Sequence, residues 1–123
     1  MDVFSALAEP TRRSIIEVLA SQGQLPASDI YSRFPVSAPA ISQHLKVLRE
    51  AQLVRVEKRA QQRIYQINPA AVFELEEWAR KVRQLWELWD ERFDALDRVL
   101  EAEKKRAVAD ENNASILQEG SDE

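Results

Sequence analysis

The chain has 123 residues, 45% hydrophobic and 31% charged, with a formal net charge of −4, which fits one small globular domain. It contains no cysteine, one histidine and two glycines, which excludes disulfides, thiolate chemistry, multi-histidine metal sites within one chain and glycine-rich phosphate loops. No apolar run reaches the ~18–20 residues of a membrane span and the start lacks a signal-peptide pattern, so we expect no membrane partner and a cytoplasmic location.

The N-terminal part of the chain predicts three short helices. Residues 2–8 form an amphipathic segment. Pro10 suits the first position of a second helix, because its missing N–H needs no partner there, and this helix stops near Gly23. A short connection at 24–26 leads to a third helix, which is broken at Pro35.

The next segment predicts a fourth helix with two different faces. Ser37 suits the N-cap, and Ile41, Leu45 and Leu48 share one apolar face at spacings of four and three. The opposite face carries Pro39, Ser42, Gln43, Lys46 and Glu50. Small polar side chains allow a helix to approach a nucleic-acid groove closely while keeping hydrogen-bonding groups at its surface.

Two runs rich in β-branched residues, 53–58 and 63–67, predict strands that residues 59–62 join as a hairpin. Between residues 46 and 63 there are six basic and two acidic side chains, so the chain has a local basic face although it is acidic overall. Salt screens remote charges over ~10 Å, and such a face can therefore bind phosphates. A solvated face and an ordinary solvated turn are the alternative interpretations.

The region from Ala70 to about Lys105 contains no glycine or proline and predicts one long helix of ~54 Å. Its apolar stripe comprises Leu75, Trp78, Val82, Leu85, Trp89, Phe93, Leu96 and Leu100. The preceding residues are too few to cover this stripe, so we expect a homodimer through this helix, assisted by residues 2–8 with Phe4. The alternative is a helix that folds back on its own domain.

The C-terminal region raises two further points. A small apolar inducer between the terminal helices, near Trp78, Trp86 and Trp89, is an alternative use of the tryptophans, although the core of a dimer is the favoured one. Residues 107–123 hold five acidic and no basic side chains and predict a frayed helix end followed by a disordered tail.

Three segments resemble the bacterial ArsR/SmtB family of transcriptional repressors. The sequence ALAEPTRRSI at residues 6–15 is similar to the family's entry into its second helix, and SAPAISQHLKVLREA at residues 37–51 is similar to its recognition helix. The third segment is Leu53-Val54 with the basic hairpin that ends in Ile64-Tyr65.

The resemblance implies a mainly α fold with a small β-hairpin, namely a winged helix-turn-helix with a long C-terminal dimerisation helix. Accordingly, we expect a DNA-binding domain at residues 1–68, a dimerisation helix at 69–106 and the tail at 107–123.

The resemblance also implies a homodimer that places two recognition helices in successive major grooves of double-stranded operator DNA. The recognition-helix residues that would face DNA are Ser37, Ala38, Pro39, Ser42, Gln43, His44 and Lys46. The other contacts would be Thr11 and Arg12 to phosphate, and Arg59, Gln62 and Arg63 in the wing. Gln43 can bond a base edge bidentately. For His44, a phosphate contact and a packed position are both open.

The sequence departs from the family pattern at several positions. Without cysteine, and with its single histidine in the recognition helix, it is not expected to sense a metal. Gln52 stands where a helix-ending glycine is usual, so a left-handed residue there would be strained. The wing tip also lacks the usual glycine, and Glu9 before Pro10 predicts a weaker cap than aspartate.

The leading hypothesis is therefore a sequence-specific repressor without chemistry of its own. The alternative is a protein-interaction module that pairs through the long helix. An enzyme is the least favoured hypothesis, because Asp90, Glu91 and Asp94 read as solvated charges and no nucleophile lies beside a base. We expect no catalytic residues, no metal ligands and no cofactor.

Overall fold

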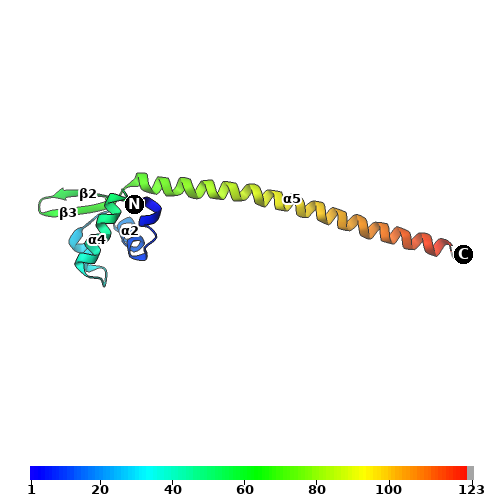
Figure 1. The fold of residues 1–123 in the computed structure, drawn as a ribbon, viewed down its shortest axis with the longest axis horizontal. Helices are drawn as coiled ribbons and strands as arrows, with labels where there is room; N and C mark the ends of the chain where they lie inside the picture. Colours follow the sequence, from blue (N-terminus) through cyan, green and yellow to red (C-terminus); the bar gives the residue numbers. More distant parts are fainter. Residues whose placement is uncertain (122–123) are drawn as a thin grey trace. The chain divides into compact units, whose positions relative to one another are not determined.

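The computed structural model describes residues 1–121, and the side chains of residues 1–113 (Figure 1). The chain divides into two units, Met1–Ala79 and Arg80–Glu123. The elements in order are α1 (Val3–Ala6), α2 (Pro10–Gln22), β1 (Leu25–Pro26), α3 (Ala27–Ser32), α4 (Ala38–Glu50), β2 (Val54–Arg59), β3 (Gln62–Ile67) and α5 (Pro69–Ser121). The predicted fold class, mainly α with a small hairpin and a long C-terminal helix, is confirmed.

The ends of the first two helices follow local sequence signals. Asp2 caps α1 by accepting a hydrogen bond from the backbone N–H of Ser5 at 2.7 Å. Glu9 caps α2 by accepting from the backbone N–H of Arg12 at 3.0 Å, with Pro10 as the first helical residue. Gly23 ends α2 at φ 84°, a conformation that glycine adopts without steric penalty.

The core of the first unit lies where helices α2, α3 and α4 meet the sheet. Figure 1 shows α2 and α4 next to the hairpin formed by β2 and β3. The largest fully buried side chains are Ile15, Leu19, Ile30, Ile41, Leu45, Leu48 and Leu53. The predicted apolar face of α4 therefore faces the core, which leaves its polar face outward.

The sheet has three antiparallel strands in the order β1–β3–β2. Strand β1, where the sequence predicted only a connection, pairs Leu25 with Tyr65 and buries the leucine. Two residues are too short to show an alternating pattern, which explains why this strand was missed.

Two residues other than glycine adopt positive φ angles in the described chain, and both stand where a glycine is usual in the family pattern. Gln52 has φ 62°, the left-handed conformation considered for this position, and Ala60 at the hairpin tip has φ 55°. The Gln52 carbonyl accepts a hydrogen bond from Asn68 Nδ2 at 2.8 Å, which helps to hold this strained conformation. With Arg59 paired to Gln62, the hairpin loop consists of only two residues rather than the predicted four.

Helix α5 has 53 residues, a length of ~80 Å. The sequence predicted a helix that ends near residue 106 and a disordered tail, but α5 continues to Ser121. The reason is local, since no glycine or proline occurs between Pro69 and Gly120 and alanine recurs in the last turns. Only residues 122 and 123 of the predicted tail lie outside the described residues.

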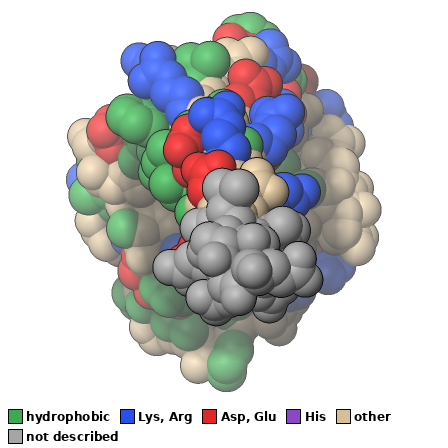
Figure 2. Space-filling model, turned by 90° about the vertical axis from the view of Figure 1, so that its right-hand side faces the viewer, with side chains coloured by type: hydrophobic (Ala, Val, Ile, Leu, Met, Phe, Trp, Pro, Cys, Tyr) green, Lys and Arg blue, Asp and Glu red, His purple; other side chains and the backbone are tan. Residues whose placement is uncertain are grey.

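The second unit is this helix from Arg80 onward. Each residue from 80 to 113 is exposed, whether it is charged or apolar. In Figure 2, where the right-hand side of Figure 1 faces the viewer, Lys and Arg side chains lie next to Asp and Glu side chains. No helix among the described residues is long and apolar enough to cross a membrane.

Candidate nucleic-acid interface

The outward face of α4 presents small polar groups and one cation. Ser42, Gln43 and Lys46 are exposed because Ile41 and Leu45 fix the helix with its other face in the core. At the start of the helix, Ser37 Oγ accepts a hydrogen bond from the Ala40 N–H at 3.4 Å. Ser37, Ala38 and Pro39 are exposed there, as expected of residues that would face DNA.

Helix α4 and strand β3 together line a depression of about 220 Å³. It is lined by Ser42, Gln43, Lys46, Arg49, Arg63 and Tyr65. Within the described part of the chain, Lys46, Arg49 and Arg63 have no ion-pair partner. Arg49 was not among the predicted DNA contacts, because it falls at the edge of the polar face of the helix. The signal for it in the sequence was its positive charge within the basic segment 46–63.

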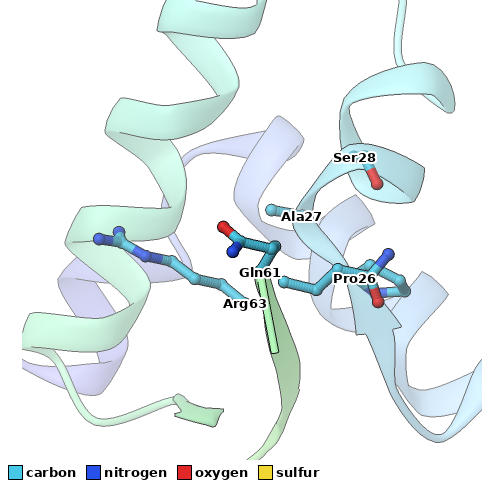
Figure 3. A pocket seen from close by; sticks show the side chains of 6 residues that line it. Pro26, Ala27, Ser28, Gln61 and Arg63 are labelled. Carbon is cyan, nitrogen blue, oxygen red and sulfur yellow. The ribbon is translucent and has the colours of Figure 1, made fainter. Parts of the chain in front are cut away.

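A second depression of about 370 Å³ lies between the hairpin tip and the start of α3 (Figure 3). It is lined by Pro26, Ala27, Ser28, Gln61, Gln62 and Arg63. In Figure 3 the Arg63 side chain extends away from Pro26 and toward a neighbouring helix. Arg63 therefore borders both depressions, and its guanidinium suits hydrogen bonds to phosphate oxygens.

The second wing arginine is less free than Arg63. Arg59 Nη2 donates hydrogen bonds to Glu57 Oε2 at 2.9 Å and to Gln24 Oε1 at 3.3 Å. The hydrogen bond and positive charge of Arg59 lower the pKa of the Glu57 carboxyl group. A DNA phosphate would thus compete with the Glu57 carboxylate for the guanidinium of Arg59. The i, i+2 spacing of these residues on one strand was the sequence signal for this pair.

The N-terminal end of α2 gathers Glu9, Arg12 and His44. Arg12 is half-buried, its Nε donates to the Ala6 carbonyl, and its Nη1 lies 3.4 Å from His44 Nδ1. His44 Nδ1 also lies 3.9 Å from Glu9 Oε2, and the His44 side chain is 21% exposed. Of the two alternatives for His44, the packed position fits these contacts. Sequence reasoning could not find the cluster, because Arg12 and His44 are 32 positions apart.

Opposing effects act on the ionisation of Glu9. Desolvation raises its pKa, while hydrogen bonds from the Arg12 N–H and from Thr11 lower it, and the net result is a pKa below the ordinary value. Thr11 follows in the first turn of the same helix and is partly exposed. The carboxylate of Glu9 lies at the same end of α2 as Thr11, for which a phosphate contact is expected.

The apolar residues expected at a dimer contact are largely exposed. Trp78 is 55% exposed and Leu85 is 53% exposed, and Phe4 packs edge-on against Trp78 at 5.3 Å between ring centroids. The other exposed members of the set are Val82, Trp89, Phe93 and Leu96. Leu75 differs from the rest, because it is partly buried against the core.

Comparison with known proteins places this geometry in a family. The family described as a helix-turn-helix domain matches residues 7–57. The HTH-type transcriptional regulator Rv2034 of Mycobacterium tuberculosis is 45% identical over 69 residues, which is 56% of this chain and 64%, less than two thirds, of that relative. The arsenical resistance operon repressor of Escherichia coli is 31% identical over 101 residues, 81% of this chain and 83% of that protein.

The chain belongs to the ArsR family. The crystal structure of an ArsR-like transcriptional regulator from Rhodococcus sp. RHA1 matches it with a TM-score of 0.61 and 32% identity, over 79% of this chain and 88% of that one. This ArsR-family chain is therefore a winged helix-turn-helix transcriptional regulator, with β2 and β3 as its wing.

Proposed function

We propose that this ArsR-family chain is a homodimeric repressor that binds operator DNA and responds to no metal. The observation that carries the proposal is the depression where the polar face of α4 meets Arg63 of the wing. It combines amide and hydroxyl groups, which suit base edges, with three unpaired cations of the described chain, which suit phosphates.

The DNA-facing residues divide by chemistry. Gln43 reads a base edge through its amide, and Ser42 bonds a base or a phosphate. Lys46 and Arg63 neutralise phosphates, with a smaller contribution from Arg59 because of its ion pair with Glu57. The remaining contacts are those of Thr11, Ser37, Ala38, Pro39 and Gln62.

Dimerisation is supported by the exposed apolar side chains of α5. A stripe of half-exposed tryptophan, leucine, valine and phenylalanine side chains is more apolar surface than a solvated helix needs. Pairing two copies buries it and creates a two-fold axis. Two copies of α4 then reach half-sites about one helical turn, ~34 Å, apart.

The proposal that the repressor does not respond to metal rests on the metal-ligating side chains that the chain can offer. The Escherichia coli relative is named for arsenical resistance. This chain, however, has no cysteine to supply thiolates, and its single histidine lies against Arg12 and Glu9. Control of DNA binding in this chain therefore acts through something other than a thiolate metal site.

The test is binding of the purified protein to DNA upstream of its own gene and to a scrambled duplex of equal length, at two salt concentrations. We expect tight binding to the upstream DNA, weak binding to the scrambled duplex, and affinity that falls steeply with salt. Sedimentation of the same sample is expected to give a dimer. Equal, weak binding to both duplexes contradicts the proposal and favours a protein-interaction module.

A further inference from the structure

We propose that Arg12 is a positioning residue which couples α1 to the recognition helix α4 through His44, and that it does not bind DNA phosphate. The inference rests on the proposed function, because what it positions is the DNA-reading face of α4. Arg12 contacts the Ala6 carbonyl and His44, and an arginine that only binds phosphate at the surface does not need these contacts.

The contacts of Arg12 reach three separate parts of the first unit. Its backbone N–H donates to Glu9 at 3.0 Å, its Nε donates to the last carbonyl of α1 at Ala6, and its Nη1 lies 3.4 Å from His44 Nδ1. Ala6 is fully buried, so the carbonyl end of this link is fixed by the core. The guanidinium therefore bridges α1 and α4 from its own position on α2.

The chemistry of the pair assigns the state of the histidine ring. A guanidinium has donors only, so a hydrogen bond between Arg12 and His44 requires Nδ1 to accept. His44 is then neutral and carries its proton on Nε2. Protonation of Nδ1 would remove the acceptor and set two cations side by side, with the carboxylate of Glu9 at 3.9 Å as the nearest compensating charge.

Arginine suits this role for geometric reasons, and lysine does not. The planar guanidinium holds its donors in fixed directions and can bind two partners at once, whereas an ammonium group is a point charge on a flexible stem. Arg13 provides a natural contrast. It is exposed and donates to the Leu7 carbonyl at 3.0 Å, so it holds the connection after α1 without touching α4.

The link joins the expected dimer surface to the DNA-reading face. Phe4 lies on α1 and contacts Trp78 of α5 edge-on at 5.3 Å within the first unit. His44 directly follows Gln43, the residue proposed to read a base. Arg12 therefore links the helix that carries Phe4 to the helix that carries Gln43, so loss of this link is expected to misalign the base contacts of α4.

The first test compares Arg12→Lys and Arg12→Ala with Lys46→Ala and Arg13→Ala, each as full-length protein, on operator and scrambled DNA across a salt series. We expect both Arg12 variants to lose about tenfold in operator affinity, with scrambled-DNA affinity and the salt slope unchanged. Lys46→Ala is expected to lower the slope, and Arg13→Ala to resemble the wild type. Restoration by Arg12→Lys, or a slope lowered by Arg12→Ala, identifies a phosphate contact and overturns the inference.

The second test needs no DNA, so it remains decisive if operator binding itself fails. His44 is the only histidine, and its ring nitrogens give the only imidazole signals in a ¹⁵N NMR spectrum of the untagged chain. At neutral pH we expect an unprotonated, hydrogen-bonded Nδ1 in the wild type and in Arg13→Ala, and loss of that hydrogen-bond shift in Arg12→Lys. A protonated Nδ1 in the wild type, or spectra identical in wild type and Arg12→Lys, overturns the inference. Failure of specific binding with the expected ring signals overturns only the proposed function.

Discussion

Residues 1–79 and the α5 residues from 80 to 113 use similar apolar side chains in opposite ways. In the first unit, Leu45 and Leu48 are at most 1% exposed, whereas Leu85 and Leu96 of α5 are 53% and 52% exposed. The first unit therefore has its own core and the means to fold alone. The second has no core of its own, so its apolar side chains are available to a second molecule.

The largest effect is expected from a charge in the apolar stripe of α5. Leu85→Glu removes about 1.5–3 kcal/mol of favourable burial free energy from each copy. The dissociation constant of the dimer should therefore rise by more than about a hundredfold. Sedimentation equilibrium measures this change. Val108→Glu is the matched control, since Val108 is similarly exposed at 52% but lies beyond the stripe. A dimer that survives Leu85→Glu would contradict the proposed interface.

The next effect compares a buried with an exposed leucine. Leu45→Ala should lower the free energy of unfolding by about 2–5 kcal/mol, because it leaves a cavity in the core. Leu96→Ala should change the unfolding of the first unit by less than about 0.5 kcal/mol, since Leu96 is 52% exposed and belongs to the second unit. Urea unfolding followed by circular dichroism, on a Leu85→Glu background that keeps the chain monomeric, measures both. Equal losses would remove the distinction between the two regions.

A smaller effect is expected at the base-reading residue. Gln43→Ala should weaken operator binding by about 1–3 kcal/mol and relax the preference at one base pair of each half-site, while its folding stays intact. Competition binding with single-base operator variants measures this change. If operator and scrambled DNA lose affinity equally, Gln43 reads no base.

Wing arginines should differ in how strongly they contribute to the salt dependence. Arg63→Ala should reduce the slope by about one unit per half-site, whereas Arg59→Ala should reduce it by less, because Glu57 already partly neutralises Arg59. Arg83→Ala on α5 is the control, as this exposed arginine lies 3.7 Å from Glu87 and outside the first unit. Equal salt slopes for Arg59→Ala and Arg63→Ala would show that the Arg59–Glu57 ion pair does not reduce the contact of Arg59 with phosphate.

The smallest effect is expected from Glu9. Its pKa is lowered in the folded protein, so the carboxylate stabilises the fold above its unfolded pKa, and this contribution disappears as pH falls through the folded pKa. Glu9→Gln should therefore be less stable than the wild type at neutral pH, and equally stable at an acidic pH below the folded pKa of Glu9. Urea midpoints at the two pH values measure it. A difference that persists in acid would assign the effect to packing rather than charge.

Local signals predicted most of the fold. The cap at Ser37, the apolar face of Ile41, Leu45 and Leu48, and the left-handed Gln52 all depend on residues within a few positions of one another, and the structure confirms them. Helix α5 continues past residue 106 because the acidic segment that follows contains no glycine or proline before Gly120.

The remaining features depend on contacts that sequence patterns do not carry. Strand β1 exists only because Leu25 meets Tyr65, which is 40 positions later. The contact of Arg12 with His44 needs α2 and α4 side by side, and no period or motif encodes it. The candidate interface was therefore predictable as a set of exposed residues, but not as an arrangement in which some of those residues hold others in place.

The alanine at the tip of the wing has a consequence for the thermodynamics of binding. Ala60 holds φ 55° in a two-residue loop, where a glycine would reach many more backbone conformations. Its methyl group makes the folded loop somewhat strained but also stiff. A stiff wing loses little conformational entropy when it meets DNA, so more of its contact enthalpy is retained as affinity.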